Sequence, residues 1–582
     1  MSSENNKYRI LFANLLERLV QDDASGKYSL PGIITNDERR SLIFAQRAFE
    51  HADSTEVTLD QDDDREKYFS KPEPEPEPEP KNFVADEPAH DETEEKGILT
   101  SQGIDALLDI SALQAGDFDD EIMLGIDFGT AYSKACMIRT KDNDEEILDL
   151  PLGEYAGEDV LTMPVHSSLF IAPDGRLYFG PIAVEKSEEA ASEGMEVTRV
   201  DSVKSFLIEE GRVTLDDTPL PKLYNPTEVE ISKEALVTFY LGYLLYLVRT
   251  AAFDRHSVDI SKIRRRVSLP YYKEGHREKV VKELSRLFSF GEVLSKSFSS
   301  EWENGFRIED VKYLYEWMRK NIKKNSPFID RFVEEPLAVA GSRLSSTGAS
   351  SGSVCMVVDV GAGTTDFNMF EILANAKTGL NDAREVGGSG YGLPYAGDYL
   401  DKVLLAFILR KAKINRSSED YQQAVISLRL DIRDYKERLF KENKLFYSLP
   451  GGRSGEVLLH EFMLDEKVKD FSQKLKDAFK HVLETIHPSW IKTKIRTKNL
   501  GQKLPVILTG GGADLPMVKT LVKGSIDVQN TIIELHLCDP APAWLTDSYE
   551  GEIISMYPQL SVSIGGAKRF LISKSSVLNA YE

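Results

Sequence analysis

The chain has 582 residues and a formal net charge of −24 at pH 7, with 41% hydrophobic and 29% charged residues. This length allows two to four domains, and the composition is that of a soluble protein with a sizeable core. No run of about eighteen apolar residues occurs, and the N-terminus lacks the basic flank and apolar stretch of a secretory signal. We therefore expect a cytoplasmic protein with no membrane partner.

The negative charge is concentrated in one segment. Residues 51–120 contain 22 acidic and five basic residues, a net charge of −17, whereas residues 1–50 contain seven of each. Such a chain should repel nucleic-acid phosphates, so no nucleic-acid partner is expected. The three cysteines show no CxxC spacing and the nine histidines no HxxxH spacing. This argues against a disulfide framework or a transition-metal site.

The first 120 residues are predicted to form an appendage in two parts. Apolar residues at helical spacing predict a small helical module over residues 1–55. Residues 56–120 are predicted to be an acidic, Pro- and Glu-rich linker, in which alternating proline and glutamate hold residues 72–80 extended. A short amphipathic helix near 98–110 either folds back on the body or docks on a partner. We expect an unidentified protein partner to be contacted through residues 1–120.

The body beyond residue 120 alternates short β-rich runs with helical periodicity, which predicts an α/β fold. Strands are predicted over residues 122–127, 263–269, 354–360 and 505–509. Helices are predicted over residues 232–252, 275–288, 308–322, 397–412, 420–440 and 464–487. Three arginines, Arg264 to Arg266, lie in the second of these strands. We interpret them as a solvated edge or as internal ion pairs rather than as a basic patch.

Two segments of the body share one pattern, a strand that delivers an aspartate into a glycine-containing turn. In the first, Asp127 ends the strand and the turn contains Gly129, Thr130, Ala131 and Tyr132. In the second, the strand delivers Asp359, and Gly361, Ala362, Gly363, Thr364 and Asp366 follow. Glycine lets the backbone turn tightly enough for its N–H groups to face a phosphate.

Two further segments complete the pattern. A predicted strand ends in Gly510, Gly511 and Gly512, and Pro516 then opens a helix. A flat base and ribose could lie against this glycine backbone. Glu335 precedes Pro336 at another predicted helix start. One such turn alone is weak evidence, because tight turns with Asp and Gly are common in α/β proteins.

Taken in this order, the turns resemble those of the actin/Hsp70/sugar-kinase ATPase superfamily, and the match is nearest to the Hsp70 nucleotide-binding domain. The resemblance covers most of residues 122–575. Residues 201–207 resemble the family segment that carries its catalytic lysine, which places Lys204 at that position. Residues 386–401 and 561–567 resemble further Hsp70 segments that sugar kinases generally lack.

The resemblance implies a two-lobed, actin-like α/β fold of duplicated ribonuclease H-like domains, with ATP or ADP and Mg²⁺ between the lobes. It implies that Asp127 and Asp359 bind Mg²⁺ mostly through its waters. It also implies that Lys204, Asp366 and Glu335 act in hydrolysis, with Lys204 offsetting charge on the γ-phosphoryl group. The implied nucleotide-binding residues are Gly129, Thr130, Ala131, Tyr132, Gly361, Ala362, Gly363, Thr364, Gly510, Gly511, Gly512 and Lys436.

The sequence departs from the Hsp70 pattern in several places. Ala362 replaces the middle glycine of the second turn, as in cell-division actin homologues. Asp514 stands where Hsp70s carry an adenine-stacking arginine, and Gln559 replaces an aspartate in the last helix. These changes put base selectivity in doubt. About fifteen residues follow Ala567, so we expect no C-terminal peptide-binding domain.

The resulting expectation is a slow, Hsp70-like ATPase, of chaperone or partner-regulating type, with residues 121–352 as lobe I and residues 353–582 as lobe II. An insertion is expected near residues 290–330, and the final helix should return to lobe I. Two alternatives remain open at this point. One is an actin-like, filament-forming cytoskeletal ATPase, and the other is a small-molecule kinase of the same superfamily.

Overall fold

The computed structural model describes residues 20–21, 28–29, 107–142, 144–153, 163–209, 212–213, 220–270, 276–343, 354–374, 381–418, 420–498, 503–568 and 573–574. The chain divides into two compact units, residues 1–95 and 96–582. In the first unit the described residues form one antiparallel pair, β1 (Val20–Gln21) and β2 (Tyr28–Ser29). The helices predicted within residues 1–55 and the extended stretch 72–80 lie outside the described residues.

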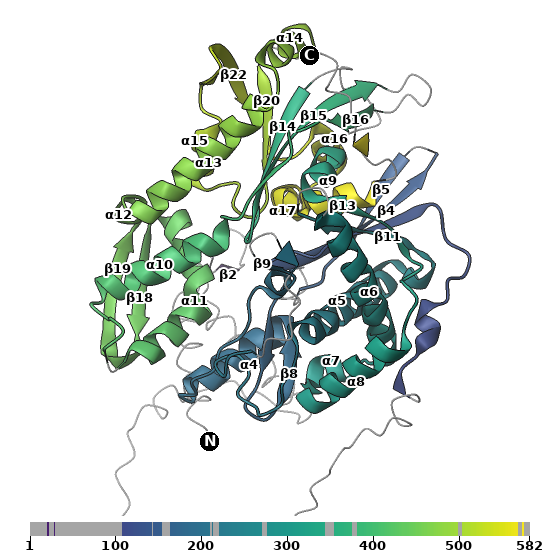
Figure 1. The fold of residues 1–582 in the computed structure, drawn as a ribbon, viewed down its shortest axis with the longest axis vertical. Helices are drawn as coiled ribbons and strands as arrows, with labels where there is room; N and C mark the ends of the chain where they lie inside the picture. The colour runs from purple at the N-terminus through teal and green to yellow at the C-terminus, as the bar shows by residue number, and fades with distance from the viewer. Residues whose placement is uncertain are drawn as a thin grey trace, which may run out of the picture. The chain divides into compact units, whose positions relative to one another are not determined.

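Two mixed sheets form the framework of residues 96–582 (Figure 1). The first sheet has the strand order β13-β11-β3-β4-β5. The strands in this order are β3 (Ile122–Asp127), β4 (Tyr132–Lys141), β5 (Asp144–Leu150), β11 (Arg264–Leu269) and β13 (Ile329–Glu334). A sixth strand, β6 (Val165–His166), pairs with β4. Strand β11 is parallel to both β3 and β13, whereas β4 is antiparallel to both β3 and β5.

The second sheet contains the strand order β22-β20-β14-β15-β16. Its strands are β14 (Val354–Val360), β15 (Thr365–Ala374), β16 (Asn381–Glu385), β20 (Leu504–Thr509) and β22 (Thr531–Leu537). Three short strands extend it, β17 (Tyr391–Leu393), β21 (Ser525–Val528) and β23 (Ser573–Lys574). Strand β20 is parallel to β14 and β22, and β15 is antiparallel to β14 and β16.

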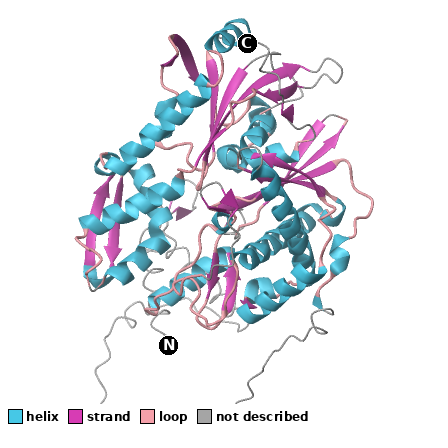
Figure 2. Cartoon of the chain, viewed as in Figure 1, coloured by secondary structure: helices cyan, strands magenta, loops and turns pink. Residues whose placement is uncertain are grey.

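The two sheets therefore repeat one topology. When the five longest strands of each sheet are numbered in chain order, both sheets have the strand order 5-4-1-2-3, with the same parallel and antiparallel neighbours. In each sheet a hairpin joins strands 1 and 2, and at least one helix lies in the chain between strands 3 and 4 and between strands 4 and 5. The predicted α/β class is confirmed (Figure 2).

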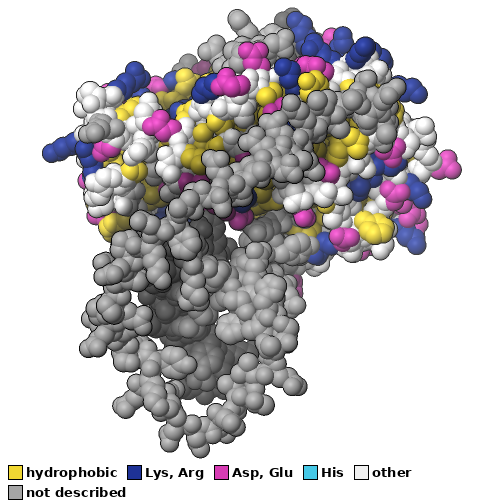
Figure 3. Space-filling model, turned by 90° about the horizontal axis from the view of Figure 1, so that it is seen from below, with side chains coloured by type: hydrophobic (Ala, Val, Ile, Leu, Met, Phe, Trp, Pro, Cys, Tyr) yellow, Lys and Arg dark blue, Asp and Glu magenta, His cyan; other side chains and the backbone are white. Residues whose placement is uncertain are grey.

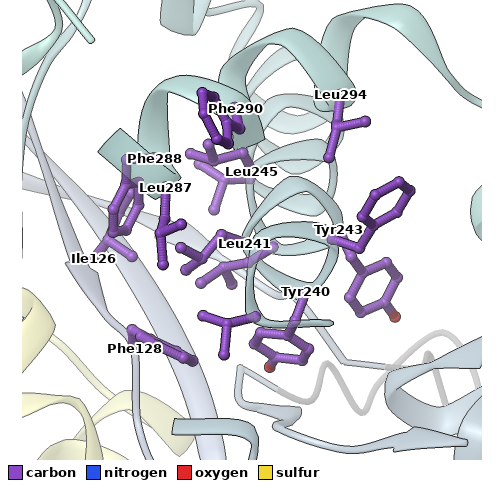
Figure 4. Close-up of a cluster of buried hydrophobic side chains, with 14 of the residues drawn as sticks. Ile126, Phe128, Tyr240, Leu241, Tyr243, Leu245, Leu287, Phe288, Phe290 and Leu294 are labelled. Carbon is purple, nitrogen blue, oxygen red and sulfur yellow. The ribbon is translucent and has the colours of Figure 1, made fainter. Parts of the chain in front are cut away.

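Helix α5 (Lys233–His256) is the centre of the core beside the first sheet. It packs along α6 (His276–Ser297), where a Cβ on Gly291 would lie 3.2 Å from the backbone nitrogen of Gly242. Figure 4 labels buried side chains of this core, namely Ile126, Phe128, Tyr240, Leu241, Tyr243, Leu245, Leu287, Phe288, Phe290 and Leu294. Among the described helices, α5 alone has the length and apolar composition of a membrane span. Burial within this core accounts for that composition.

Helices α9 (Glu335–Ser342) and α17 (Glu552–Ala567) cross between the two sheets (Figure 1). Each follows the fifth strand of its sheet, α9 after β13 and α17 after β22 and α16. A Cβ on Gly565 would lie 1.7 Å from the carbonyl oxygen of Ala338, so glycine is required where the helices touch. A Cβ on Gly125 in β3 would similarly lie 2.1 Å from the carbonyl oxygen of Ser563. Helix α17 thus rests directly on the first sheet.

We call residues 107–343, which contain the first sheet, the first half, and residues 354–574, which contain the second sheet, the second half. Both halves have additional helices and strands between the strands of their sheets. In the first half these are β6 (Val165–His166), β7 (Leu169–Ile171), β8 (Arg176–Phe179), α4 (Gly180–Ser192), the 3-10 helix η2 (Val203–Phe206), β9 (Ile208–Glu209), β10 (Arg212–Val213), η3 (Ile260–Lys262), α7 (Glu301–Asn304), β12 (Phe306–Arg307) and α8 (Ile308–Asn321). The insertion expected near residues 290–330 contains α7, β12 and α8.

The second half has a larger set of added elements. They are α10 (Gly397–Lys411), α11 (Tyr421–Glu442), β18 (Lys444–Leu449), η4 (Pro450–Gly452), β19 (Arg453–Leu458), α12 (Leu459–Met463), α13 (Glu466–Glu484), α14 (Pro488–Lys498), α15 (Pro516–Leu521) and α16 (Ala543–Ser548). Helices α10 and α11 pack on each other, and α11 also contacts α4 of the first half.

Residues just before 121 already pack on the core of the first half. Leu108 and Leu113 are buried in the core of the first half, within and beside η1 (Ile110–Leu113). The backbone N–H of Asp109 donates to Ser297 Oγ at 2.8 Å, and Lys296 Nζ lies 3.0 Å from Asp109 Oδ2. The end of the predicted 98–110 segment is therefore packed on α6, and residues 98–106 lie outside the described residues.

The arginines of β11 form ion pairs rather than a basic patch. Arg265 pairs with Glu292 at 2.7 Å with both side chains fully buried, and Arg266 pairs with Asp330 at 2.8 Å. Arg264 pairs with Asp120, an exposed residue just before β3. Where Figure 3 displays described residues, cationic and anionic side chains intermix across the surface.

The four predicted strands correspond to β3, β11, β14 and β20, and the bounds of β3 and β14 agree to the residue. The six predicted helices correspond to α5, α6, α8, α10, α11 and α13. Helix α6 runs nine residues beyond its predicted end at 288, to Ser297. Its last turns bury apolar residues against α5, and the one glycine in them, Gly291, packs on α5 rather than ending the helix.

We predict that Gly565→Ala lowers the free energy of unfolding of the chain by about 1–3 kcal/mol, the usual cost of overpacking a core. The added methyl group would overlap the Ala338 carbonyl, so the two helices must separate. Urea denaturation monitored by circular dichroism measures the change. Gly116→Ala is the control, because a Cβ on Gly116 would have no atom within 4 Å. Equal denaturation midpoints for the two variants would refute the role assigned to Gly565.

Candidate functional site

The two hairpin turns between strands 1 and 2 of each sheet meet at one place. The first turn joins β3 to β4 through residues 128–131, and the second joins β14 to β15 through residues 361–364. A Cβ on Gly363 would lie 2.9 Å from Thr130 Oγ1. The structure thus brings together two turns that are more than two hundred residues apart in the sequence.

Ser167, which directly follows β6, holds the first turn in shape together with side chains from β4 and α5. Ser167 Oγ donates to the carbonyl oxygen of Gly129 at 2.8 Å and lies 3.0 Å from Ser133 Oγ. Tyr240 Oη donates to the Ser133 hydroxyl at 3.1 Å from α5. A Cβ on Gly129 would lie 2.0 Å from the carbonyl oxygen of Tyr132, so only glycine fits this turn.

The second turn is held by the start of α10. The N–H groups of Gly397 and Asp398 donate to the carbonyl oxygens of Gly361 and Ala362, at 3.2 and 2.8 Å. The Gly361 N–H in turn donates to the carbonyl oxygen of Thr364 at 3.0 Å. Lys436 of α11 contacts the start of α10, with its ammonium group 2.8 Å from Asp401 Oδ1 and 3.3 Å from the carbonyl oxygen of Gly397.

The third glycine turn packs against the end of β14. Gly510 has a φ of +81°, and a Cβ there would lie 2.5 Å from Asp359 Oδ1. The Gly512 N–H donates to the carbonyl oxygen of Val360 at 2.9 Å. Gly511 is exposed, and a Cβ on it would have no atom within 4 Å. All three predicted turns are therefore neighbours at the C-terminal end of β14.

A buried ion pair lies beside the turns. Lys204 Nζ donates to Glu335 Oε1 at 2.7 Å, with the two side chains 7% and 13% exposed. Burial lowers the pKa of Lys204, but Glu335 and nearby aspartates raise it by more, so the net shift of this pKa is upward. Lys204 is therefore a buried ammonium ion at neutral pH and not an exposed surface lysine.

A second ion pair is not predictable from the sequence. Lys134 of β4 lies directly opposite Asp127 in the antiparallel register, and its Nζ donates to Asp127 Oδ2 at 3.1 Å. Ser268 at the end of β11 donates to the other carboxylate oxygen of Asp127 at 2.9 Å. A lysine within a strand indicates a solvent-facing position, and only the strand pairing reveals its partner.

The equivalent pair in the second sheet consists of two carboxylates. Asp359 lies opposite Asp366 in the register of β14 and β15. Thr364 Oγ1 donates to Asp366 Oδ2 at 2.9 Å. Burial, together with Glu335 and Asp366, raises the pKa of Asp359 well above its usual range. Burial also raises the pKa of Glu335, against the opposing effect of Lys204.

These groups act on one another electrostatically, and we call them the carboxylate cluster. Its members are the carboxylates of Asp127, Glu335, Asp359 and Asp366 and the ammonium groups of Lys134 and Lys204. With all groups ionised, four negative and two positive charges leave a net charge of −2. A buried excess of negative charge is costly without a counter-ion. The cluster is therefore suited to hold additional positive charge.

The donor set fits Mg²⁺ in its usual coordination. Within the described part of the chain, no group of three or more His, Cys, Asp or Glu side chains is spaced to hold a metal ion directly. Mg²⁺ usually keeps several waters and is bound by one or two carboxylates together with substrate phosphates. The net charge of the carboxylate cluster and the predicted ligands Asp127 and Asp359 agree with that mode.

Residues of the second half hold the turn that carries Lys204. Arg433 of α11 donates through Nη2 to the carbonyl oxygen of Asp201 at 2.8 Å and to Ser202 Oγ at 2.9 Å. Ser202, the residue before η2, also donates to Asp398 Oδ2 at 2.9 Å. The sequence gives no indication of these contacts of Arg433, because its partners lie more than two hundred residues away.

The remaining predicted positions lie at the margins of this site. The Tyr132 ring packs on His166 at 4.7 Å between ring centroids. Burial, with nearby Arg199, lowers the pKa of His166 to about 4. Asp514 is exposed and pairs with Lys519 at 2.8 Å, and Gln559 is exposed on α17. Neither of these last two side chains takes part in the carboxylate cluster.

Comparison with known proteins does not add to this description. Neither a scan of the chain against models of protein families nor a search of curated proteins finds a match.

We predict that Asp359→Asn raises the melting temperature of the ligand-free protein at pH 7. Because the pKa of Asp359 is higher in the folded state than in the unfolded state, the protein is most stable with respect to this group when pH lies below the ordinary pKa of aspartate. That contribution to stability falls as pH rises toward and through the raised pKa of the folded state. Asparagine does not titrate, so the gain should be small near pH 4 and should grow toward neutral pH. Thermal melts across that range measure it.

Asp514→Asn provides the control, because this exposed carboxylate lies outside the carboxylate cluster. Its melting temperature should follow that of the unmodified protein at every pH. If Asp359→Asn behaves in the same way, Asp359 bears no raised pKa and the electrostatic account of the site fails.

Proposed function

We propose that residues 107–568 bind ATP with Mg²⁺ and hydrolyse it slowly, in the manner of an Hsp70-like nucleotide-binding domain. One observation carries the proposal, the meeting of two equivalent hairpin turns beside a buried lysine–glutamate pair. Backbone N–H groups at glycine turns suit phosphate oxygens. A buried ammonium ion next to them suits the charge that develops on a phosphoryl group during transfer.

The repeated sheet topology supports the proposal of a two-lobed, actin-like fold. In that fold, duplicated ribonuclease H-like domains hold the nucleotide between them, at the turns that follow the first strand of each. The two sheets of this chain repeat the order 5-4-1-2-3, and α9 and α17 occupy equivalent places after the fifth strands. A chance α/β arrangement has no reason to repeat both features.

The proposed roles follow from the contacts of the site. The amides near Gly129, Thr130, Gly363 and Thr364 hold the β- and γ-phosphates. Lys204, kept charged by Glu335, stabilises the developing charge, and Asp366, oriented by Thr364, positions the attacking water. Asp127 and Asp359 hold Mg²⁺ mainly through its waters, and the ion neutralises phosphate charge when bound.

We propose that the site selects among nucleotide bases less strongly than the site of Hsp70s does. The family's adenine-stacking arginine is replaced by Asp514, which is exposed and paired with Lys519. Lys436, predicted to contact the nucleotide, is engaged with Asp401 and with the start of α10. The glycine backbone at Gly511 remains open for a flat ring. Binding energy then comes mostly from the phosphates.

The output of the ATPase is proposed to be a protein partner reached through the segment before residue 121. The packing of Leu108 and Leu113 in the first half gives that segment a fixed attachment to the ATPase body. Closure of the two halves around nucleotide would thereby be transmitted to the attached chain.

We predict that a saturating ATP–Mg²⁺ titration raises the melting temperature of the full chain. A ligand that binds only the folded state stabilises it by mass action, by about 2.7 kcal/mol at a hundredfold excess over Kd. Differential scanning fluorimetry measures the shift, with AMP as the matched nucleotide that lacks the β- and γ-phosphates. An unchanged melting temperature with ATP–Mg²⁺ would contradict the proposed function.

We predict that Lys204→Met keeps nucleotide binding but slows hydrolysis by roughly 10²–10³-fold, the usual effect of losing one electrostatic stabiliser. Phosphate release under single-turnover conditions measures the rate. Because the substitution leaves Glu335 buried without its cation, the double variant Lys204→Met/Glu335→Gln serves as the stability control. Hydrolysis at the unmodified rate in either variant would show that Lys204 has no part in the chemistry.

A further inference from the structure

Both carboxylate oxygens of Asp127 are already occupied by donors of the protein itself. Lys134 Nζ donates to Oδ2 at 3.1 Å, and Ser268 Oγ donates to Oδ1 at 2.9 Å. Asp127 is 7% exposed and Lys134 14% exposed in this pair. The carboxylate proposed to bind Mg²⁺ is therefore held by an internal cation in the ligand-free arrangement.

The charge of Lys134 extends beyond Asp127. Burial raises the pKa values of Glu335 and Asp359, and Lys134 is among the groups that oppose the rise. Its ammonium group thus favours the ionised form of several carboxylates of the cluster. An ion that approached these carboxylates from solvent would meet a positive charge already in place, at a cost set by Coulomb repulsion in a partly desolvated site.

The backbone of Lys134 is fixed, whereas its side chain is flexible. Its backbone is paired with Asp127 by the register of β3 and β4, directly after the first turn. The lysine side chain is a long flexible stem with a compact charge, and it can redirect its ammonium group without backbone movement. A phosphate held by the first turn would offer that ammonium group a stronger negative partner.

We propose that Lys134 is a built-in counter-cation that excludes free Mg²⁺ from the carboxylate cluster and releases Asp127 only when a nucleotide phosphate takes up its ammonium group. Lys134 then balances phosphate charge, and Asp127 becomes available to the metal ion that accompanies the nucleotide. Mg²⁺ therefore binds together with the nucleotide and does not bind first. The inference rests on the proposed function of the site.

The position of Lys134 supports this role over a purely structural one. The equivalent position in the second sheet is Asp366, which lies opposite Asp359 as Lys134 lies opposite Asp127. The fold therefore does not need a lysine there to form the hairpin. Buried ion pairs also add little net stability compared with apolar residues, so stability alone does not account for this pair.

The test is a titration of the nucleotide-free full chain with MgCl₂ at constant ionic strength, followed by calorimetry and by thermal melts. We expect no saturable binding at millimolar Mg²⁺ for the unmodified protein. Lys134→Met and Lys134→Gln should bind Mg²⁺ at least about tenfold more tightly, because one positive charge has been removed from the cluster. Lys134→Arg, which keeps the charge, should behave like the unmodified protein.

Lys186→Met is the matched control, because it removes a lysine from a comparable 2.8 Å pair with Glu189 at the surface. Its Mg²⁺ binding should not change. Saturable submillimolar Mg²⁺ binding by the unmodified, nucleotide-free protein would overturn the proposal, even if every variant at position 134 failed to fold. Equal Mg²⁺ affinity in Lys134→Met and the unmodified protein would overturn it as well.

A second titration, with ATP present, separates this inference from the proposed function. If ATP–Mg²⁺ shifts the melting temperature but Lys134→Met gains no affinity for Mg²⁺ alone, the ATPase proposal stands and the role of Lys134 falls. If Lys134→Met gains Mg²⁺ affinity but ATP–Mg²⁺ stabilises neither protein, the exclusion of metal by Lys134 stands. The nucleotide-binding proposal, and with it the release step, then falls.

Discussion

The close crossing of α9 and α17 sets the distance between the two sheets. Gly565 leaves no side chain between the helices, so their backbones meet at Ala338. Each helix follows the fifth strand of its sheet, and this contact therefore fixes both sheets relative to one another. The hairpin turns come together at Thr130 and Gly363 as a result. The site depends on this helix contact more than on any single side chain within it.

The same geometry creates an electrostatic problem at the point where the sheets meet. Four carboxylates converge with only two ammonium groups, and burial raises the pKa values of Glu335 and Asp359. A fold selected for stability alone would place apolar or paired groups there. Perturbed pKa values of this kind concentrate at functional sites, where a ligand of opposite charge relieves the repulsion. The repulsion is thus a reason to expect a cationic ligand.

The sequence predicts the framework better than the partners of individual side chains. The strands 122–127 and 354–360 are recognisable because each is a short apolar run with an aspartate at its last or second-last position, and a glycine-containing turn follows. The packing of Leu108 and Leu113 on α6 is not predictable in this way, since a short apolar run gives no indication of what covers it. The contacts of Arg433 with the Lys204 turn are equally hidden, because no local pattern reports a partner two hundred residues away.

Lys134 and Asp366 occupy equivalent positions in the two sheets, and only the strand register shows it. Each lies seven residues after the aspartate of its turn, at equivalent positions of a repeated hairpin. The two turns are alike in backbone but opposite in charge at this position. A phosphate chain placed between them meets a cation on one side and a carboxylate on the other. Under the proposed function, this asymmetry gives the two turns different tasks, with the first balancing phosphate charge and the second orienting water. The repeated strand topology accounts for the shape of the site, and the difference between lysine and aspartate at this position accounts for its polarity.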